Sequence, residues 1–314
     1  MIPRIAKETT IELRSQIAYR KFQELLLSLI ERGGPAPQEY ASLSRAIRDL
    51  GDEVRARAIP TRELRHVMKK TAIEHFQGTM QAASILKKHG YSGDFEIIDD
   101  IYQMRIAEKP CLRKWDLYFH AQAAPCAVRN RKSYFHQLLR TLSDRCDASR
   151  PRVLNIASGP ARDMREWFDA NPDSRIHFDC IELDTKAIAH ANSLCAPYLD
   201  RMHYQHQNAL KFVPTGKHDL IWSAGLFDYL SDHLFVRLLR SLLPFVKERG
   251  EVVVGNFSEF NASRDYMELL GDWYLEHRSE ERLRGLAEKS GAPARQIEVL
   301  WEPEGVNYFL HVHS

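Results

Sequence analysis

The chain has 314 residues, which is long enough for about two domains. Its 44 lysines and arginines nearly balance its 42 aspartates and glutamates, so the net charge of +2 favours neither a nucleic-acid partner nor an anionic membrane. The N-terminal segment mixes charges into every turn, and no run of about 18 apolar residues occurs. We therefore expect a soluble, cytoplasmic protein without a membrane span.

The spacing of cysteines and histidines indicates no metal site. The five cysteines contain no CxxC pair, so they predict neither a disulfide framework nor a zinc site. One HxH pattern occurs, His311 and His313, in the alternating stretch YFLHVHS. Two residues on the same face of a last strand are its simplest interpretation. We expect no bound metal ion.

From the start to about residue 145, apolar residues recur every three or four positions, which predicts helices. Turns are expected at 33–37, 59–61 and 89–94, where glycine, proline and polar residues gather. We assign residues 1–148 to an N-terminal helical domain, whose first helix could pair across a homodimer. The three apolar stripes are Phe22, Leu25, Leu26, Leu29 and Ile30; Leu43, Ile47, Leu50 and Val54; and Leu64, Val67, Met68, Phe76, Met80 and Leu86.

After residue 148 short β-branched runs alternate with helical stretches, which is typical of a parallel sheet flanked by helices. The clearest helix is expected at 232–246. Only a short Pro-Glu-Gly turn joins the last two runs, so they should form an antiparallel hairpin. Residues 149–314 are thus predicted to be an α/β, Rossmann-like domain with a seven-stranded sheet. The expected strands are 152–156, 176–181, 202–205, 218–222, 251–256, 296–301 and 306–312.

A glycine-bearing turn follows the first of these strands, in VLNIASGPARD at 153–163. Ligands of such sheets bind outside the carboxyl ends of the strands. Gly159 lets the backbone approach a ligand, and Pro160 suits the first turn of a helix, where a missing N–H costs little. Because one glycine is a weak signal, a tight turn without a ligand remains an alternative.

Three further strand ends carry residues that suit the same kind of ligand. Glu182 and Asp184 follow the second strand, where a carboxylate can accept both hydroxyls of a ribose. Asn208 and Ala209 follow the third, where a side-chain amide can pair with an adenine edge. The small residues 223–225 follow the fourth and leave room for the reactive end of a cofactor.

Together these residues resemble the class I S-adenosylmethionine-dependent methyltransferases, over residues 150–314. Asn155, Ala157, Gly159 and Ala161 stand where the first motif of that family has an acidic residue and three glycines. The alanines disfavour a dinucleotide more than S-adenosylmethionine, since pyrophosphate needs a closer backbone. The resemblance implies S-adenosylmethionine as the cofactor. The cofactor-binding residues it implies are Asn155, Ala157, Ser158, Gly159, Pro160, Glu182, Leu183, Asp184, Asn208, Ala209, Ser223, Ala224 and Gly225.

A narrower resemblance covers most of the chain beyond residue 85. The segments 87–105, 115–135, 225–230 and 256–278 are similar to bacterial methyltransferases that make the methyl ester of hydroxypalmitic acid, a quorum signal. This similarity implies a small-molecule acceptor, methylated on the oxygen of a fatty or hydroxy acid.

The residues expected around the acceptor lie in the helical half and after the fourth strand. Arginines in a segment that could fold over the cofactor would clamp a carboxylate, although a solvated helix face or domain pairing explains them equally well. The substrate-binding candidates are Tyr118, Arg129, Arg131 and Tyr229. A carboxylate acceptor needs no general base, whereas an alcohol or amine does, and His120 and Asp228 are then the catalytic candidates.

Other functions remain open on the sequence. One is an N- or O-methyltransferase of an aromatic or amine natural-product intermediate. Another is a non-catalytic scaffold with a degenerate cofactor fold, which the missing glycines would favour. An RNA methyltransferase is disfavoured by the balanced charge and by the lack of an aromatic and basic binding surface.

Overall fold

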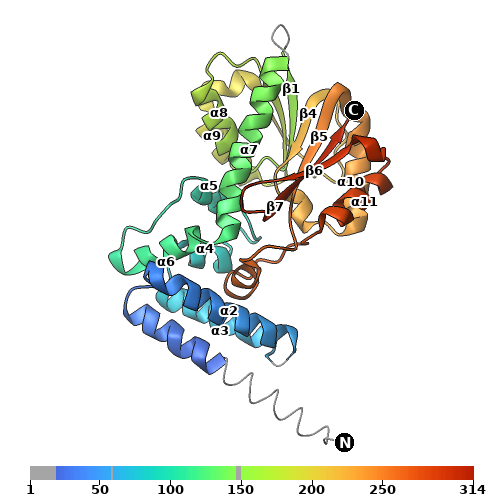
Figure 1. The fold of residues 1–314 in the computed structure, drawn as a ribbon. Coiled ribbons are helices and arrows are strands. Elements are labelled where there is room, and N and C mark those ends of the chain that lie inside the picture. The colour runs from blue at the N-terminus through green and yellow to red at the C-terminus, as the bar shows by residue number, and fades with distance from the viewer. Residues whose placement is uncertain (1–18, 58, 146–149) are drawn as a thin grey trace, which may run out of the picture. The chain divides into compact units, whose positions relative to one another are not determined.

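A computed structural model describes residues 19–57, 59–145 and 150–314, and Cys146 lies outside these ranges. The chain forms two compact units, a helical unit, Met1–Pro125 with Ala262–Tyr274, and a sheet unit, Cys126–Asn261 with Leu275–Ser314 (Figure 1). The units therefore divide within α7 (Ala123–Arg145), earlier than the boundary at 148 that the sequence suggests. The reason is that Phe135, Leu139 and Leu142 of α7 pack in the core of the sheet unit.

The helical unit follows the predicted periodicity with one exception. The third apolar stripe is broken, because Gly78 adopts a left-handed φ of 92° and Thr79 caps a new helix by accepting a hydrogen bond from the backbone N–H of Ala82. The elements are the helical residues 19–31, η1 (Pro37–Glu39), α2 (Tyr40–Arg55), α3 (Thr61–His75), α4 (Met80–Leu86), α5 (Phe95–Tyr102), α6 (Pro110–His120) and the π-helix η5 (Tyr266–Leu270).

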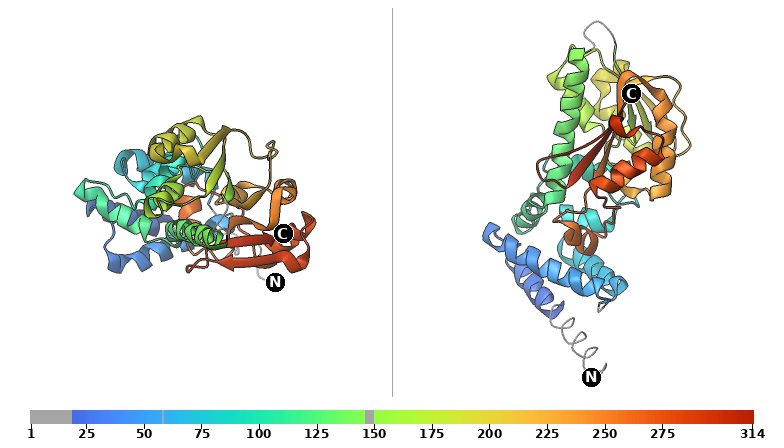
Figure 2. Two further views of the ribbon diagram at one scale, coloured as in Figure 1. Left: turned by 90° about the horizontal axis from the view of Figure 1, so that it is seen from above. Right: turned by 45° about the vertical axis from the view of Figure 1, so that its right-hand side comes forward.

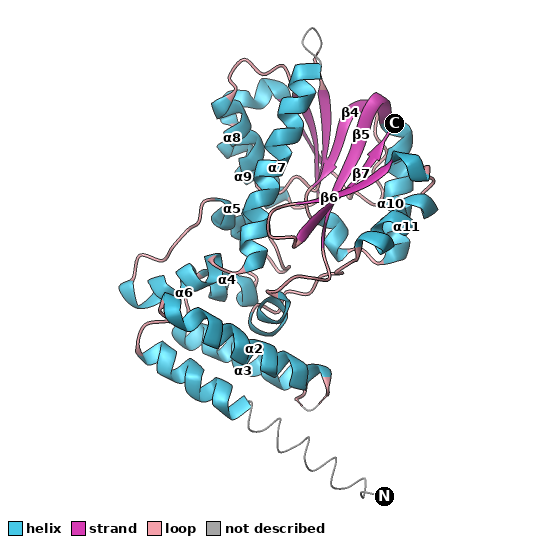
Figure 3. Cartoon of the chain, in the orientation of Figure 1, coloured by secondary structure: helices cyan, strands magenta, loops and turns pink. Residues whose placement is uncertain are grey.

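The strands of the sheet unit form one sheet with helices packed beside it (Figure 3). The sheet has seven strands in the order β3-β2-β1-β4-β5-β7-β6, which confirms the predicted fold class. β1 to β5 are parallel, and β7 pairs antiparallel with β5 and β6, so the predicted hairpin is confirmed (Figure 2). Among the described helices, none combines the length and the apolar character needed to cross a membrane. The strands are β1 (Arg152–Ile156), β2 (His177–Glu182), β3 (Met202–His206), β4 (His218–Ser223), β5 (Val246–Phe257), β6 (Ile297–Trp301) and β7 (Asn307–His313).

Helices cover both faces of this sheet, because alternate strand residues point to opposite sides. On one face, α7, α8 (Arg162–Ala170) and α9 (Thr185–Leu194) pack on Val153, Phe178 and Trp222. On the other, α10 (Asp232–Leu242) and α11 (Glu280–Lys289) pack on residues such as Leu154 and Val252 (Figure 1). Each face has its own apolar core. The remaining short helices are η2 (Ala196–Arg201), η3 (Leu226–Tyr229), η4 (Leu243–Phe245) and η6 (Ala294–Gln296).

Among the expected strands and the helix expected at 232–246, two limits differ from the prediction by more than one residue. The helix expected at 232–246 ends at Leu242, because Pro244 has no N–H to continue it. The strand expected at 251–256 already begins at Val246. The pairing between β4 and β5 shifts register between His218 and Leu220, so β5 already pairs with β4 at Val246. No local sequence pattern indicates this shift.

The segment that follows β5 belongs to the helical unit over Ala262–Tyr274. Its Asp272 adopts a left-handed φ of 49° and forms ion pairs with Arg65 at 2.6 Å and Lys87 at 2.8 Å. Both partners lie in the helical unit, so this carboxylate serves packing there.

One wholly buried cation, Arg278, holds the end of the sheet unit together. Its guanidinium donates to the carbonyl oxygens of Phe227 and Leu230 and to Oδ1 of Asn256, and it pairs with Asp232 at 3.1 Å. A buried guanidinium is tolerated only when its donors are matched in this way. Arg278 therefore fixes η3 against the end of β5 and the start of α10.

We expect Arg278→Met to destabilise the protein by about 3–5 kcal/mol, since three acceptors and one carboxylate lose their buried donor. The matched control is Arg282→Met, because Arg282 pairs with the same Asp232 at 2.9 Å but is half exposed. Its loss should cost below about 1 kcal/mol. Urea unfolding measures both, and equal costs would contradict the role given to Arg278.

Candidate cofactor-binding site

The strand order places the carboxyl ends of β3, β2, β1 and β4 side by side along one edge of the sheet. The loop after β1 is tied to β2, because the backbone N–H groups of Ala157 and Ser158 donate to Ile181 O at 2.8 and 3.3 Å. The N–H of Gly159 donates to Oε2 of Glu182 at 2.9 Å. The first two predicted strand ends are thus in direct contact.

The loop keeps a glycine-like backbone at all three motif positions. Ala157, Gly159 and Ala161 have φ values of 55°, 59° and 61°, although only one of them is a glycine. An L-residue in this left-handed region costs about 1–2 kcal/mol. The two alanines therefore store strain in the loop. Pro160 is not in the first helical turn as expected, because α8 starts at Arg162 with Ala161 as its N-cap.

Two polar atoms of this loop are buried without a hydrogen-bond partner among the described residues: Oδ1 of Asn155 and Oγ of Ser158. Buried polar atoms are nearly always satisfied, so such atoms indicate a ligand or water. The missing side chain of Gly159 would meet nothing within 4 Å, so the loop faces open space at that position. The amide nitrogen of Asn155 lies 3.6 Å from the sulfur of Met164, which fixes the orientation of its side chain.

The carboxylate of Glu182 lies at the tip of β2 and is held by backbone donors. Besides Gly159, its Oε1 accepts from the N–H groups of Leu183 at 2.7 Å and Asp184 at 3.0 Å. Leu183, the next residue, is 59% exposed. Asp184 caps α9 through a hydrogen bond from the Lys186 N–H, which gives it a structural role.

The third and fourth strand ends are arranged differently. Oδ1 of Asn208 accepts from the Leu210 N–H at 2.9 Å in a turn, so that an adenine contact would fall to its amide nitrogen. Ala209 packs against the apolar core. Ser223 is fully buried and donates to Ile156 O, so its hydroxyl joins β4 to β1 rather than facing the edge.

Arg131 of α7 lies at the end of β4. Its guanidinium donates to Ala224 O at 3.1 Å, and a Cβ added to Gly225 would lie 2.7 Å from it. A larger residue at position 225 would therefore require the guanidinium of Arg131 to move. Arg131 is 6% exposed, which rules out the solvated helix face considered above.

Two buried carboxyl groups lie within the field of Arg131. Burial raises the pKa of Asp228 to about 7, although the hydrogen bond from the Phe257 N–H and the charges of Arg131 and Arg278 lower it. Burial likewise raises the pKa of Asp163 in the first turn of α8. Sequence reasoning missed Asp163, which a search for acids just after the glycine turn would have found.

The other acceptor candidates are spread over both units. Tyr229 of η3 is 44% exposed, and Arg129 donates to the sulfur of Cys126 at 3.1 Å. Tyr118 and His120 belong to the helical unit and are buried there. The hydroxyl of Tyr118 forms a hydrogen bond with that of Ser44, and burial raises the pKa of Tyr118 to about 12. Nε2 of His120 lies 2.8 Å from Arg105 O.

No family model and no curated protein matches the sequence. Solved structures do match. A possible exported protein from Bordetella parapertussis is similar with a TM-score of 0.60 and 14% identity, over 82% of this chain and 98% of that one. A putative O-methyltransferase from Nostoc punctiforme has a TM-score of 0.50 and 12% identity, over 79% and 69%. At such identities the likeness shows only that this chain shares the fold of these two proteins.

We expect Ala157→Gly to stabilise the protein by about 0.5–1 kcal/mol, since relief of the left-handed strain exceeds the added chain entropy of glycine. As a control, Ala189→Gly at an exposed position within α9 should cost about 1 kcal/mol, because glycine is unfavourable inside a helix. Urea unfolding measures both, and a destabilised Ala157→Gly variant would contradict the strain.

The raised pKa of Asp228 predicts a pH effect on stability. Between about pH 4 and pH 7 the folded chain binds a proton that the unfolded chain has lost, so the contribution of this group to stability falls as pH rises, by up to about 1.4 kcal/mol per pH unit. Asp228→Asn has no such titrating group. Its free energy of unfolding should therefore rise relative to that of the wild type across this window, and the difference should stay constant above pH 7.

Asp232→Asn provides the opposite case. Burial raises the pKa of Asp232, but its bonds to Arg282 and Arg278 outweigh this and lower it. That variant should therefore lose stability relative to the wild type as pH rises through about 4. Denaturant unfolding at several pH values tests both signs.

Proposed function

We propose that the protein is an S-adenosylmethionine-dependent methyltransferase that acts on a small-molecule acceptor. The observation that carries this proposal is the loop after β1. The end of β1 and this loop hold two buried polar atoms, on Asn155 and Ser158, that have no partner among the described residues, and the same loop faces open space at Gly159. Since the carboxylate of Glu182 lies within hydrogen-bond reach of the same loop, the residues fit a ligand with both a ribose and a polar amino-acid end.

Different residues along this edge would bind different parts of the cofactor. Glu182 would accept the two ribose hydroxyls, and the amide nitrogen of Asn208 would bind the adenine edge. Oδ1 of Asn155 would accept from the ammonium group of the methionine portion, in place of the acidic residue of related proteins. The bound cofactor supplies an activated methyl group, so the chain mainly has to orient the acceptor and exclude water.

For the acceptor we propose a carboxylic acid, such as a fatty or hydroxy acid, methylated on oxygen. Arg131 supports this choice, because it is a buried guanidinium at the end of β4 and can hold a carboxylate through paired hydrogen bonds. An ionised carboxylate is already nucleophilic, so no proton has to be removed.

One observation favours a second candidate, an alcohol or amine acceptor. Asp228 has a pKa of about 7, because burial raises it, and a group with a pKa near neutrality is well matched to general-base catalysis. Its Oδ1 accepts from Phe257 N–H, which leaves Oδ2 for a proton. Under this alternative Asp228→Asn abolishes turnover, whereas methylation of an acid continues.

The cofactor assignment is tested by calorimetry with S-adenosylmethionine. We expect saturable binding by the wild type and at least tenfold weaker binding by Glu182→Ala, because the ribose hydroxyls lose their acceptor. Glu288→Ala, on the exposed surface of α11, is the matched control and should bind as the wild type does. Equal affinities for all three proteins would sink the assignment.

The acceptor assignment is tested with a panel of acids, phenols, alcohols and amines, with the product identified by its mass. For Arg131→Met we expect the KM of the acid to rise at least tenfold while the Kd of S-adenosylmethionine is unchanged. If the Kd of S-adenosylmethionine rises instead, Arg131 binds the carboxylate of the cofactor, and the assignment of Arg131 to the acid acceptor is wrong.

A further inference from the structure

Three side chains that can ligate a metal ion come together at the other edge of the sheet. Glu251 of β5 is paired across the antiparallel ladder with His313 of β7, and His311 lies two residues earlier on the same face. Their ligand atoms all lie within 4.8 Å of one another. The sequence showed only the two histidines, because Glu251 is 60 residues away from His311 in the chain.

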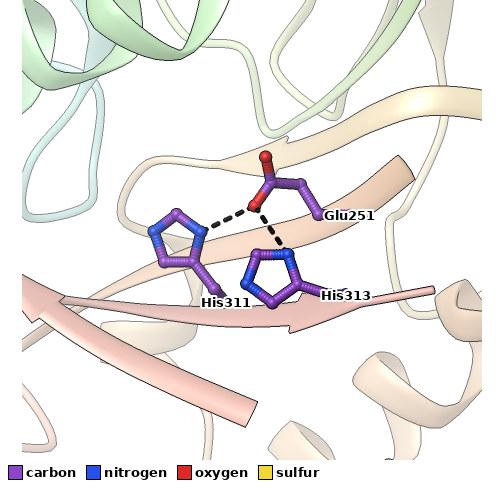
Figure 4. A group of neighbouring side chains, drawn as sticks. All are labelled: Glu251, His311 and His313. Atoms are coloured by element: carbon purple, nitrogen blue, oxygen red, sulfur yellow. Dashed lines mark hydrogen bonds and ion pairs between the residues drawn. The ribbon is translucent and has the colours of Figure 1, made fainter. Parts of the chain in front are cut away.

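Both imidazoles direct the same nitrogen at the same carboxylate oxygen. Oε2 of Glu251 lies 2.7 Å from Nδ1 of His311 and 3.6 Å from Nδ1 of His313 (Figure 4). The shorter of these two distances is that of a hydrogen bond, and the longer one is not. A cation among the three atoms would satisfy both nitrogens and the oxygen at once.

The outer nitrogen of His311 has an oxygen partner at hydrogen-bond distance, whereas that of His313 lies farther from the nearest carboxylate oxygen. Nε2 of His311 lies 2.6 Å from the hydroxyl of Tyr134, and Nε2 of His313 lies 3.6 Å from Oε2 of Glu298. Metal-bound histidines almost always donate their second N–H to such a group, which fixes the ring and its tautomer. This pattern is a second observation, independent of the cluster itself.

Burial leaves the group open on one side. The side chains of His311 and Glu251 are 4% and 14% exposed, whereas that of His313 is 46% exposed. A metal ion could therefore enter from solvent past His313 and keep water in a fourth position. The stacking of Tyr134 on Phe309, with centroids 3.8 Å apart, holds the hydroxyl beside His311.

We propose that Glu251, His311 and His313 form a binding site for one Zn²⁺ ion that joins β5 to β7. Two imidazole nitrogens and one carboxylate oxygen form a ligand set that zinc accepts in tetrahedral coordination, whereas Mg²⁺ and Ca²⁺ prefer oxygen.

The proposed site lies away from the cofactor edge, so we assign it no part in methyl transfer. Glu251 is paired with Leu220 near the start of β4, whereas the cofactor edge lies at the ends of the strands. From Glu251 to Phe257 at the end of β5, an extended strand covers about 20 Å. The ion would instead fasten the end of β7 to the strand that it pairs with.

The test uses the full chain, freed of metals with a chelator and titrated with ZnCl₂ by calorimetry. We expect one Zn²⁺ per chain, and no saturable binding of Mg²⁺ or Ca²⁺. Substitution with Co²⁺ should give the visible absorption of a tetrahedral site, which added Zn²⁺ removes. An ion pair between Glu251 and His311 without metal predicts no saturable Zn²⁺ binding, and that result would overturn the proposal.

Two variants test whether Zn²⁺ binds at these three residues. His313→Gln lies at a half-exposed position that should tolerate the change, and it should weaken Zn²⁺ binding at least tenfold. The matched control is His233→Gln, at an exposed position of α10, which should leave the affinity unchanged. Equal affinities in these two variants would show binding elsewhere and contradict the site.

Tyr134→Phe tests the outer partner of His311. Loss of such a hydrogen bond typically weakens metal binding by about 10–100-fold. Zinc should also raise the Tm of the wild type and leave that of His313→Gln unchanged, while the affinity for S-adenosylmethionine stays the same in both. A zinc affinity that Tyr134→Phe does not change would remove the second line of support.

Discussion

The carboxyl edge of the sheet depends on one buried charge, the guanidinium of Arg278. Because a cation removed from water is stable only with its donors matched, the oxygens of η3, β5 and α10 must all be in place around it. Asp228 adds a second link, since its carboxyl group accepts from the Phe257 N–H at the end of β5. The end of β4 is thereby fixed, and with it Gly225 and the contact with Arg131.

The fold could be predicted because its signals are local. Short β-branched runs and alternating stretches mark strands wherever they occur, and the turn before β7 is too short for anything except a hairpin. The limits of β5 and the placement of 262–274 could not be predicted. Both depend on partners distant in the sequence, a shifted register with β4 for the first and ion pairs with Arg65 and Lys87 for the second.

The location of the candidate site along the sheet edge could be predicted in the same way. Parallel strands end at one edge, so the residues after four of them had to lie near each other. The left-handed backbone of Ala157 and Ala161 was not predictable, since alanine rarely adopts it and only the surrounding contacts impose it. Nor was the approach of Arg131 to Gly225, because α7 and the loop after β4 are remote in the sequence.

The carboxylate of Glu182 already occupies the backbone N–H groups of Gly159, Leu183 and Asp184. For the proposed cofactor, entry is then an exchange in which the carboxylate gives up the Gly159 N–H and gains two ribose hydroxyls. A ribose with both hydroxyls replaces the hydrogen bond that the carboxylate loses, whereas a deoxyribose supplies one hydroxyl fewer. Under the proposed function, the loop would therefore contribute more to discrimination between sugars than to the strength of binding.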